Sequence, residues 1–308
     1  MTLPAIYDAI IVGGGPAGLS AALVLGRCRR RVLVCDVGHP RNERSKAMHG
    51  FLSRDGMAPQ DFAQVCRDQL VRYPNVELRT EEIVHARREG QQFVLNLGRG
   101  VIEQCRTLLL ATGIVDELPQ IPGFDRFYGR SIHHCPYCDG WENQDRPTAV
   151  LGGDTAALEL TIELLQWSKD LVLCTNGQPS PAPERQKMRK LGVPTLTEPI
   201  AILEGEGDQL SAIRFQTGEV IERSALFFSP IQRQRSHLAK ELGCEFCEDG
   251  SVQCEESAET CVRGLFAAGN ASRGLQLVIL AAAEGTQAAF AINERLSEED
   301  RNRDLKEA

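Results

Sequence analysis

Two cysteines separated by two residues lie near the middle of the chain, in the segment Cys135-Pro136-Tyr137-Cys138. Such a pair can close a small disulfide ring that is readily reduced and re-formed once one sulfur is held as a thiolate. Asp139 follows the second cysteine, where a carboxyl group can handle the proton of a departing thiolate. His134 precedes the first cysteine and can tune its thiolate or act as an alternative base. The segment predicts a redox-active disulfide with the catalytic residues Cys135, Cys138, Asp139 and His134.

Less specific interpretations of these residues are also open. His133 and His134 can instead hydrogen-bond nearby backbone, a common structural use of histidine. The cysteine pair can be half of a structural zinc site, but zinc takes about four ligands and no matching pair lies near it. A second group, at Cys244, Cys247, Cys254 and Cys261, has a spacing unlike familiar zinc modules and is typical of buried free thiols. We therefore predict no metal site.

A glycine-rich turn near the start of the chain predicts a nucleotide-binding unit. An apolar strand over 9–12 leads into Gly13-Gly14-Gly15-Pro16-Ala17-Gly18, and an apolar-faced helix follows over 19–25. A second strand over 31–35 ends at Asp36, which stands 23 residues after Gly13. Glycines at a helix N-terminus let a pyrophosphate approach unpaired amides, and the acid can bind ribose hydroxyls. The complete pattern of strand, loop, helix, strand and acid predicts a dinucleotide cofactor.

A second unit of the same kind follows the cysteine segment. A strand over 148–151 leads into Gly152-Gly153-Asp154-Thr155-Ala156-Ala157, a helix runs to about residue 167, and another strand covers 171–174. Residues 264–270 predict a last strand and turn, before a long apolar-faced helix over 276–292. The chain thus contains two βαβ nucleotide-type units, of which the second is smaller and inserted.

Composition limits the remaining classes of function. A chain of 308 residues with 42% hydrophobic residues is long enough for about two domains with substantial cores. Its formal charge of -8 disfavours nucleic acid or an anionic membrane surface as the main partner, because both would repel it. No apolar run reaches the roughly 18 to 20 residues that span a bilayer, and no basic flank precedes the apolar N-terminal stretch. We therefore expect a cytoplasmic protein whose cysteines are mostly reduced.

The order of these parts resembles one family. The first glycine loop, Ala111-Thr112-Gly113, the CxxC pair, the second glycine loop and Ala267-Ala268-Gly269-Asn270 follow one another as in low-molecular-weight thioredoxin reductases, over nearly the whole chain. The resemblance implies an α/β fold of two Rossmann-like, three-layer ββα dinucleotide-binding domains, the second inserted into the first. The FAD-binding domain would comprise residues 1–117 and 244–308, and the inserted pyridine-nucleotide-type domain residues 118–243 with the CxxC pair. A homodimer that acts on thioredoxin or a similar protein dithiol is also implied.

The resemblance further implies roles for individual residues. Electrons would pass from reduced FAD to the inner Cys138, and the outer Cys135 would attack the disulfide of the partner. Gly269 and Asn270 fall where the family has a Gly-Asp pair beside the ribityl phosphate, and asparagine there keeps hydrogen-bonding capacity without the charge. A helix beginning after Gln276 would cover the flavin. The predicted FAD contacts are Gly13, Gly15, Pro16, Ala17, Gly18, Asp36, Arg41, Asn42, His49, Thr112, Gly113, Gly269, Asn270, Gln276 and Leu277.

A neighbouring branch of flavoproteins supplies the main alternative. The segment from Arg41-Asn42 to His49-Gly50-Phe51-Leu52 and the pair His133-His134 are similar to fungal and bacterial dithiol oxidases, which close disulfides in small metabolites. In that branch a histidine usually follows the second cysteine, whereas Asp139 stands here as in thioredoxin reductases. The enzymatic alternative is therefore a small-molecule dithiol oxidase that uses oxygen. A non-enzymatic flavin-binding redox sensor is a further alternative.

The electron donor is the point at which the chain departs from the family. NADPH-dependent members carry GxGxxA in the inserted domain and arginines after the next strand. Here Asp154 replaces the second glycine and brings negative charge towards the pyrophosphate, and the strand ends without arginine at Thr175-Asn176-Gly177. We expect that ordinary NADPH binding is lost. The combination is similar to the diflavin-linked disulfide oxidoreductases of cyanobacteria, in which a second FAD occupies this position; the predicted second site is Gly152, Gly153, Asp154, Thr155, Thr175 and Asn176.

Overall fold

The computed structural model describes residues 6–98, 100–180, 182–272 and 274–307. The chain divides into two compact units. The first unit holds the chain up to Glu43, Pro59–Val115 and the chain from Gln232 onward, and the second holds Arg44–Ala58 and Asp116–Ile231. The observed crossings thus fall at 115/116 and 231/232, two and twelve residues before the predicted boundaries at 117/118 and 243/244, and the segment 44–58 groups with the second unit.

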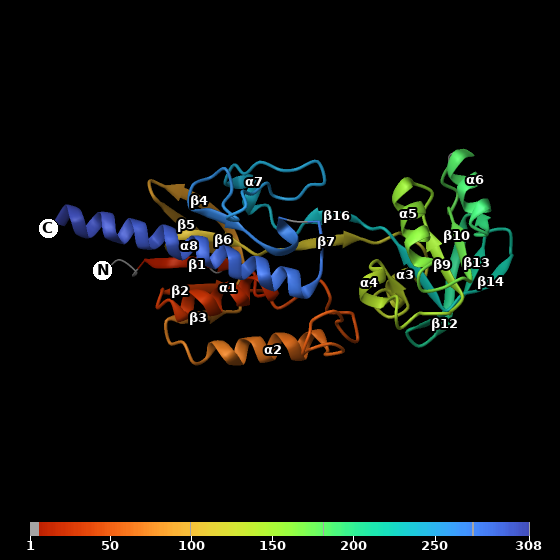
Figure 1. Ribbon diagram of the computed structural model, residues 1–308, viewed down its shortest axis with the longest axis horizontal. Helices are drawn as coiled ribbons and strands as arrows, with labels where there is room; N and C mark the ends of the chain where they lie inside the picture. The colour runs from red at the N-terminus through yellow and green to blue at the C-terminus, as the bar shows by residue number, and fades with distance from the viewer. Residues whose placement is uncertain (1–5, 99, 181, 273, 308) are drawn as a thin grey trace. The chain divides into compact units, whose positions relative to one another are not determined.

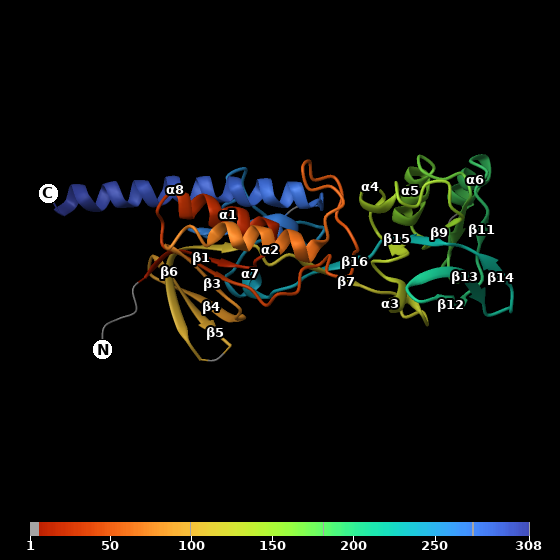
Figure 2. The ribbon, with the colours of Figure 1, turned by 90° about the horizontal axis from the view of Figure 1, so that it is seen from below.

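The first unit is built on a seven-stranded sheet (Figure 1). Its strand order is β3-β2-β1-β6-β5-β4, and β17 pairs with β6; the strands are β1 (Tyr7–Val12), β2 (Val32–Cys35), β3 (Val76–Arg79), β4 (Ile83–Glu89), β5 (Gln92–Leu97), β6 (Ile102–Leu110) and β17 (Leu265–Ala267). Three helices, α1 (Pro16–Arg27), α2 (Pro59–Leu70) and α8 (Val278–Glu307), lie on one face of this sheet (Figure 2). The short α7 (Leu238–Glu241) packs on the opposite face, and the 3₁₀ turn η1 (Gly269–Ala271) follows β17.

Alternation along β1 explains why both faces of this sheet are covered. Ile10 and Val12 enter one apolar core, while Ala9 and Ile11 enter the core on the other face, as a period of two requires. On the helical face α1 and α8 approach closely, since a side chain at Gly285 would begin 1.9 Å from the carbonyl oxygen of Ala17. Only glycine permits that approach of two helix backbones.

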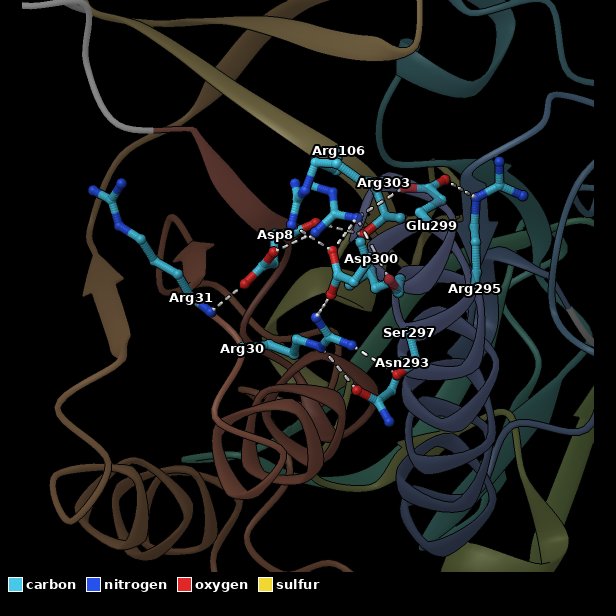
Figure 3. A network of polar contacts seen from close by, with 12 residues as sticks. Asp8, Arg30, Arg31, Arg106, Asn293, Arg295, Ser297, Glu299, Asp300 and Arg303 are labelled. Carbon is cyan, nitrogen blue, oxygen red and sulfur yellow. Dashed lines mark hydrogen bonds and ion pairs between the residues drawn. The ribbon is translucent and has the colours of Figure 1, made fainter. Parts of the chain in front are cut away.

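A network of charged side chains connects the C-terminal half of α8 with β1, β6 and the segment after α1 (Figure 3). Asp300 lies 2.6 Å from Arg30, just after α1, and 2.8 Å from Arg106 on β6. Arg106 also contacts Asp8 on β1 at 3.0 Å. Because these side chains are only 14–27% exposed, the network is screened less than a surface ion pair and joins both ends of the chain in one unit.

The second unit contains a five-stranded parallel sheet of order β11-β10-β9-β15-β8. Its strands are β8 (Ile132–His133), β9 (Thr148–Leu151), β10 (Leu171–Cys174), β11 (Thr195–Leu196) and β15 (Ala225–Phe228). An antiparallel sheet of β12 (Ile200–Glu206), β13 (Gln209–Phe215) and β14 (Val220–Glu222) and the helices α3 (Phe124–Phe127), α4 (Pro136–Asp139), α5 (Thr155–Leu164) and α6 (Ala182–Lys190) complete it. Where the chain crosses between units, β7 (Ile114–Glu117) and β16 (Ile231–Gln234) pair as a two-stranded sheet.

Among the described residues, no helix combines the length and the apolar character that a membrane span requires.

Candidate nucleotide and redox sites

Four predicted FAD segments meet at one edge of the first sheet. The last residue of β1, Val12, pairs with Cys35 of β2 and with Leu110 of β6, and Leu110 pairs with Ala267 of β17. All these strands are parallel, so the residues that follow them emerge at the same carboxyl edge. The sheet therefore brings together the glycine loop at 13–15, Asp36, the turn at 111–113 and the turn at 268–270.

The first glycine loop leaves the start of α1 open. Gly13 has φ +108°, and a side chain there would begin 2.3 Å from the carbonyl oxygen of Ala111, so both conformation and space require glycine. Gly15 is the N-cap of α1 and Pro16 opens the first turn; no side chain within the described structure caps these amides. Apart from its own chain neighbours, no described atom lies within 4 Å of the point where a Gly15 side chain would begin. Helix amides open in this way attract an anion.

A cavity of about 340 Å³ lies against this loop. Its wall includes Gly14, Gly15 and Pro16 from the loop, together with the carboxylate residue Asp36 and Asn42. Residues of α2 and Val278 of α8 close the remaining sides. Open helix amides beside a carboxylate fit a pyrophosphate and an adjoining ribose, so these residues suit the adenosine diphosphate part of FAD.

Further predicted FAD residues lie in turns and loops of the first unit. Arg41 donates a hydrogen bond to the side chain of Gln276, which also exchanges hydrogen bonds with Gln232. The amide of Gly269 donates to Glu284 at 2.8 Å, and Asn270 follows it in η1. Leu277 precedes α8, and Thr112 and Gly113 lie in the turn after β6.

His49 is placed differently from the other predicted FAD contacts. It lies in the segment that groups with the second unit, with its Nε2 3.5 Å from Glu142 and its Nδ1 3.4 Å from Asp55. The ion pairs of Arg44 with Asp125 and of Lys46 with Asp208 hold the beginning of this segment to the second unit.

The second glycine loop has the same position in its unit, but side chains of this unit accept hydrogen bonds from its amides. It follows β9, and Gly152 has φ +138°. Asp154 is the N-cap of α5, and its Oδ1 accepts the amide of Ala157 at 3.0 Å. The amide of Gly153 donates to the side chain of Gln178, also at 3.0 Å. Two of the donors that a phosphate would use are therefore occupied by side chains of the chain itself.

At the end of the neighbouring strand, the side chains of Asn176 and Arg185 are engaged by the chain itself, but among the described residues the hydroxyl of Thr175 is not. Thr175 is fully buried, and its hydroxyl has no hydrogen-bond partner among the described residues. The side chain of Asn176 accepts the amide of Ile200 at 2.7 Å. Arg185, the nearest arginine in the sequence, donates to the carbonyl oxygen of Ser180. Thr155 is the first residue of α5 and completes the predicted second site.

Cys135 and Cys138 form a disulfide across the short helix α4. Their Cα atoms are 5.3 Å apart. The pair follows β8 at the carboxyl edge of the second sheet, where Cys135 is the N-cap of α4 and Pro136 opens its first turn. Both cysteines are half-buried, whereas Tyr137 between them is 69% exposed. A partner can therefore approach the disulfide from the side of Tyr137.

Asp139 is held by a histidine on β8. The Nδ1 of His133 lies 3.1 Å from Oδ1 of Asp139, and the His133 side chain is only 6% exposed. Its ring packs on Phe227, and its Nε2 has no partner among the described residues. This contact sets the Nδ1 edge of the buried ring against the carboxyl group of Asp139, which directly follows Cys138 in the sequence.

His134, the first residue after β8, contacts different partners from His133. Its Nδ1 lies 3.2 Å from the hydroxyl of Tyr128, and that hydroxyl donates to Asp116 at 2.9 Å. The phenol has one proton, which goes to the carboxylate, so the Nδ1 of His134 is the donor to Tyr128. His134 directly precedes Cys135 in the sequence, so its imidazole is a candidate proton acceptor for that sulfur.

Four of the remaining cysteines are buried and are poor nucleophiles. Burial raises the pKa of the Cys35 and Cys174 thiols to about 12, and it also raises the pKa values of Cys105 and Cys244. A thiol with a raised pKa is rarely a thiolate near neutral pH. In the described residues, Cys244, Cys247, Cys254 and Cys261 do not bring three ligand atoms together.

Four residues that contribute to these sites were missed or left unassigned in the sequence. The side chain of Gln178 accepts a hydrogen bond from the amide of Gly153, 25 residues earlier in the chain. Tyr128 and Asp116 support His134, and His133 holds Asp139. No sequence pattern indicated the contacts of the two histidines, which depend on how the chain packs around β8.

Comparison with known proteins agrees with this arrangement. Residues 7–285 match the family described as pyridine nucleotide-disulphide oxidoreductase. The chain is 35% identical over 291 residues to the thioredoxin reductase tcpT of Claviceps purpurea, covering 88% of each chain. It is 34% identical over 177 residues to a protein of Arthroderma benhamiae named probable thioredoxin reductase, which covers 56% of this chain and 44% of that one.

Solved structures show the same fold. The structure of a protein named HlmI superimposes with a TM-score of 0.96 at 37% identity, covering 100% of this chain and 98% of that one. The predicted α/β fold with two Rossmann-type domains and the resemblance to thioredoxin reductases are confirmed. The chain belongs to the pyridine nucleotide-disulphide oxidoreductase family and is a thioredoxin reductase-like flavoprotein oxidoreductase.

Proposed function

We propose that this enzyme exchanges electrons between FAD, held by the first unit, and the Cys135–Cys138 disulfide of the second, and that it acts on thioredoxin or a similar protein dithiol or disulfide. The observation that carries the proposal is the disulfide with an acid–base group at each end: Asp139 held by His133, and His134 held by Tyr128. The open glycine loop and its cavity support FAD as the cofactor.

Reduction of the disulfide needs two electrons and up to two protons. FAD, when bound, supplies a carrier that gives or takes two electrons. The bond between the two sulfurs breaks, Cys138 is the sulfur nearer the flavin by family resemblance, and both sulfurs become thiol or thiolate. Asp139 can hold the proton of Cys138, and the imidazole of His134 is the candidate to hold that of Cys135.

Transfer to a partner is then a thiol–disulfide exchange. The Cys135 thiolate attacks one sulfur of the partner disulfide, a mixed disulfide forms, and the other partner sulfur leaves as a thiolate. Cys138 attacks Cys135, the internal disulfide closes again, and the partner is released as a dithiol. The same steps in reverse oxidise a partner dithiol and load the electrons onto the flavin.

Cysteine variants test this role. Replacement of Cys135 or Cys138 by Ser should abolish turnover with a protein disulfide while FAD stays bound. Cys247→Ser is a matched control, since Cys247 is an exposed free cysteine. Undiminished turnover of both active-pair variants would exclude the assignment.

The donor in this proposal is not ordinary NADPH. Its support is that Asp154 and Gln178 occupy amides of the second loop and that Arg185 is engaged with Ser180. Anaerobic mixing with NADPH should leave the flavin oxidised, and rapid bleaching would refute this point. A second FAD in the inserted domain predicts two FAD released per chain on denaturation, whereas one per chain contradicts it.

The closed second loop also favours a second candidate, a small-molecule dithiol oxidase. With no nicotinamide donor, a substrate dithiol would reduce the Cys135–Cys138 disulfide, the electrons would pass to FAD, and oxygen would accept them as hydrogen peroxide. Peroxide formed in step with oxidation of a small dithiol, without turnover of thioredoxin, supports this alternative. Turnover of thioredoxin without peroxide supports the reductase.

Family resemblance extends the proposal to assembly. We propose a homodimer, with residues 1–117 and 244–308 forming the FAD-binding domain and residues 118–243 the inserted domain. Light scattering coupled to gel filtration should give twice the mass of one chain, and a monomeric mass would contradict the dimer.

A further inference from the structure

Three potential metal ligands converge on the surface of the first unit. None of them is a predicted cofactor-binding or disulfide residue. They are His85 on β4, His237 at the N-cap of α7, and Glu241 at the end of α7. The Nδ1 of His85 lies 3.2 Å from Oε1 of Glu241, and the Nε2 of His237 lies 3.6 Å from Oε2. All donor atoms lie within 4.8 Å of one another.

The backbone under these three residues is held by the core. Leu238 and Ala239 of α7 pack in the same buried cluster as Ile83 and Ala86 of β4, and each is at most 5% exposed. The pairing of β4 with β5 shifts register between residues 83 and 85, and a bulge of this kind re-aims a side chain. His237 and Glu241 share a face because they are four residues apart on a helix.

The donor set and its spacing match a transition metal. Two imidazole nitrogens and one carboxylate are ligands of zinc, and bonds of about 2.0–2.2 Å at tetrahedral angles separate neighbouring donors by roughly 3.3 Å. The nitrogens of His85 and His237 lie 3.2 and 3.6 Å from different oxygens of Glu241, and one donor atom from each residue lies within 4.8 Å of the other two. Both histidines are 63% exposed, so the ring protons can sit on the opposite nitrogens and remain hydrated.

We propose that His85, His237 and Glu241 form a binding site for Zn²⁺ or a similar late first-row transition metal. Water fills the fourth position, because the cluster lies open to solvent. The ion would link β4 to α7 and so stabilise the folded first unit over the unfolded chain. Mg²⁺ and Ca²⁺ prefer oxygen donors, so a site with two imidazole nitrogens does not suit them.

Calorimetric titration of the flavin-loaded protein with Zn²⁺, with the disulfide oxidised, should show one zinc ion bound per chain at this site. His85→Ala, His237→Ala and Glu241→Gln should each weaken it by at least about tenfold. His39→Ala is the matched control, since His39 and Glu43 form an exposed pair four residues apart that lacks a second histidine. Cys247→Ser and Cys261→Ser control for zinc held by exposed thiols.

Two further measurements distinguish loss of the metal site from misfolding of a variant. Zinc should raise the melting temperature of the wild type and the His39→Ala protein but not of His237→Ala, whose circular dichroism should match the wild type. Cobalt at the site should give visible bands without the near-ultraviolet absorption of cobalt–thiolate bonds. Zinc titrations that are indistinguishable between wild type and His237→Ala, or the absence of any zinc binding, would overturn the proposal.

Discussion

Each unit places a glycine loop between the first strand of a βαβ unit and a helix, and the two loops differ in what occupies their amides. In the first, Gly15 is the helix N-cap and no described side chain caps α1. In the second, Asp154 is the N-cap and accepts the amide of Ala157, while Gln178 takes the amide of Gly153. A topology that makes an anion site in one unit thus supports a self-capped helix in the other.

The difference shows that the N-cap residue decides the use of the loop. A glycine N-cap leaves donors for a phosphate, and an aspartate supplies a carboxylate in the place where the phosphate would sit. Much else is shared: both loops begin with a glycine at positive φ, and both second strands end in a buried cysteine, Cys35 and Cys174.

The largest effect should follow from moving the second loop's N-cap into the first. Gly15→Asp should lower FAD retention by at least about 100-fold, because a carboxylate there would cap the helix and repel the pyrophosphate. Flavin absorbance per chain after gel filtration measures this. Gly15→Asn is the control of equal size without charge and should retain more FAD. Full retention by Gly15→Asp would remove the basis of the comparison.

Alkaline pH should act alike on the two units through their equivalent cysteines. Burial raises the pKa of Cys35 and Cys174 from 9.0 to about 12. Between pH 9 and 12 the unfolded chain therefore loses thiol protons that the folded one keeps, so stability present below pH 9 falls by about 1.4 kcal/mol per pH unit for each thiol. In Cys35→Ala and in Cys174→Ala, the free energy of unfolding measured with denaturant should fall less steeply with pH than in the wild type. In Cys28→Ala, a change at an exposed cysteine, it should fall as in the wild type.

A smaller effect should follow from removing the cap in the second loop. Asp154→Ala should lower the free energy of unfolding by about 0.5–2 kcal/mol, because the amide of Ala157 loses its acceptor. Asp154→Asn keeps an acceptor of the same size and should lose less. Equal denaturation midpoints for wild type and Asp154→Ala would show that the carboxylate does not serve as a cap.

The smallest effect should come from Gln178, whose side chain is exposed. Gln178→Ala should cost at most about 0.5–1.5 kcal/mol, the net value of one hydrogen bond. Hydrogen exchange should detect it locally, as faster exchange of the Gly153 amide. Gln216→Ala, an exposed glutamine of the same unit, should leave that amide unchanged.

The sequence by itself determined the parts that depend on neighbours along the chain. Strand alternation, the glycines before α1 and α5, the acid after the second strand, and the CxxC spacing are local patterns, so the family and the fold class followed from them. The negative charge at Asp154 also pointed to a changed second loop, because an N-cap acts on amides only three residues away.

Only the tertiary structure decided which donors meet which acceptors across long separations. Gln178 reaches Gly153, His133 turns to Asp139 while His134 turns to Tyr128, and His85 meets His237 although 152 positions separate them. These contacts depend on strand register and on how α7 packs against β4, which no local pattern encodes. The sequence thus specified the two loops and the disulfide, and packing decided which of their polar groups remain open to a ligand.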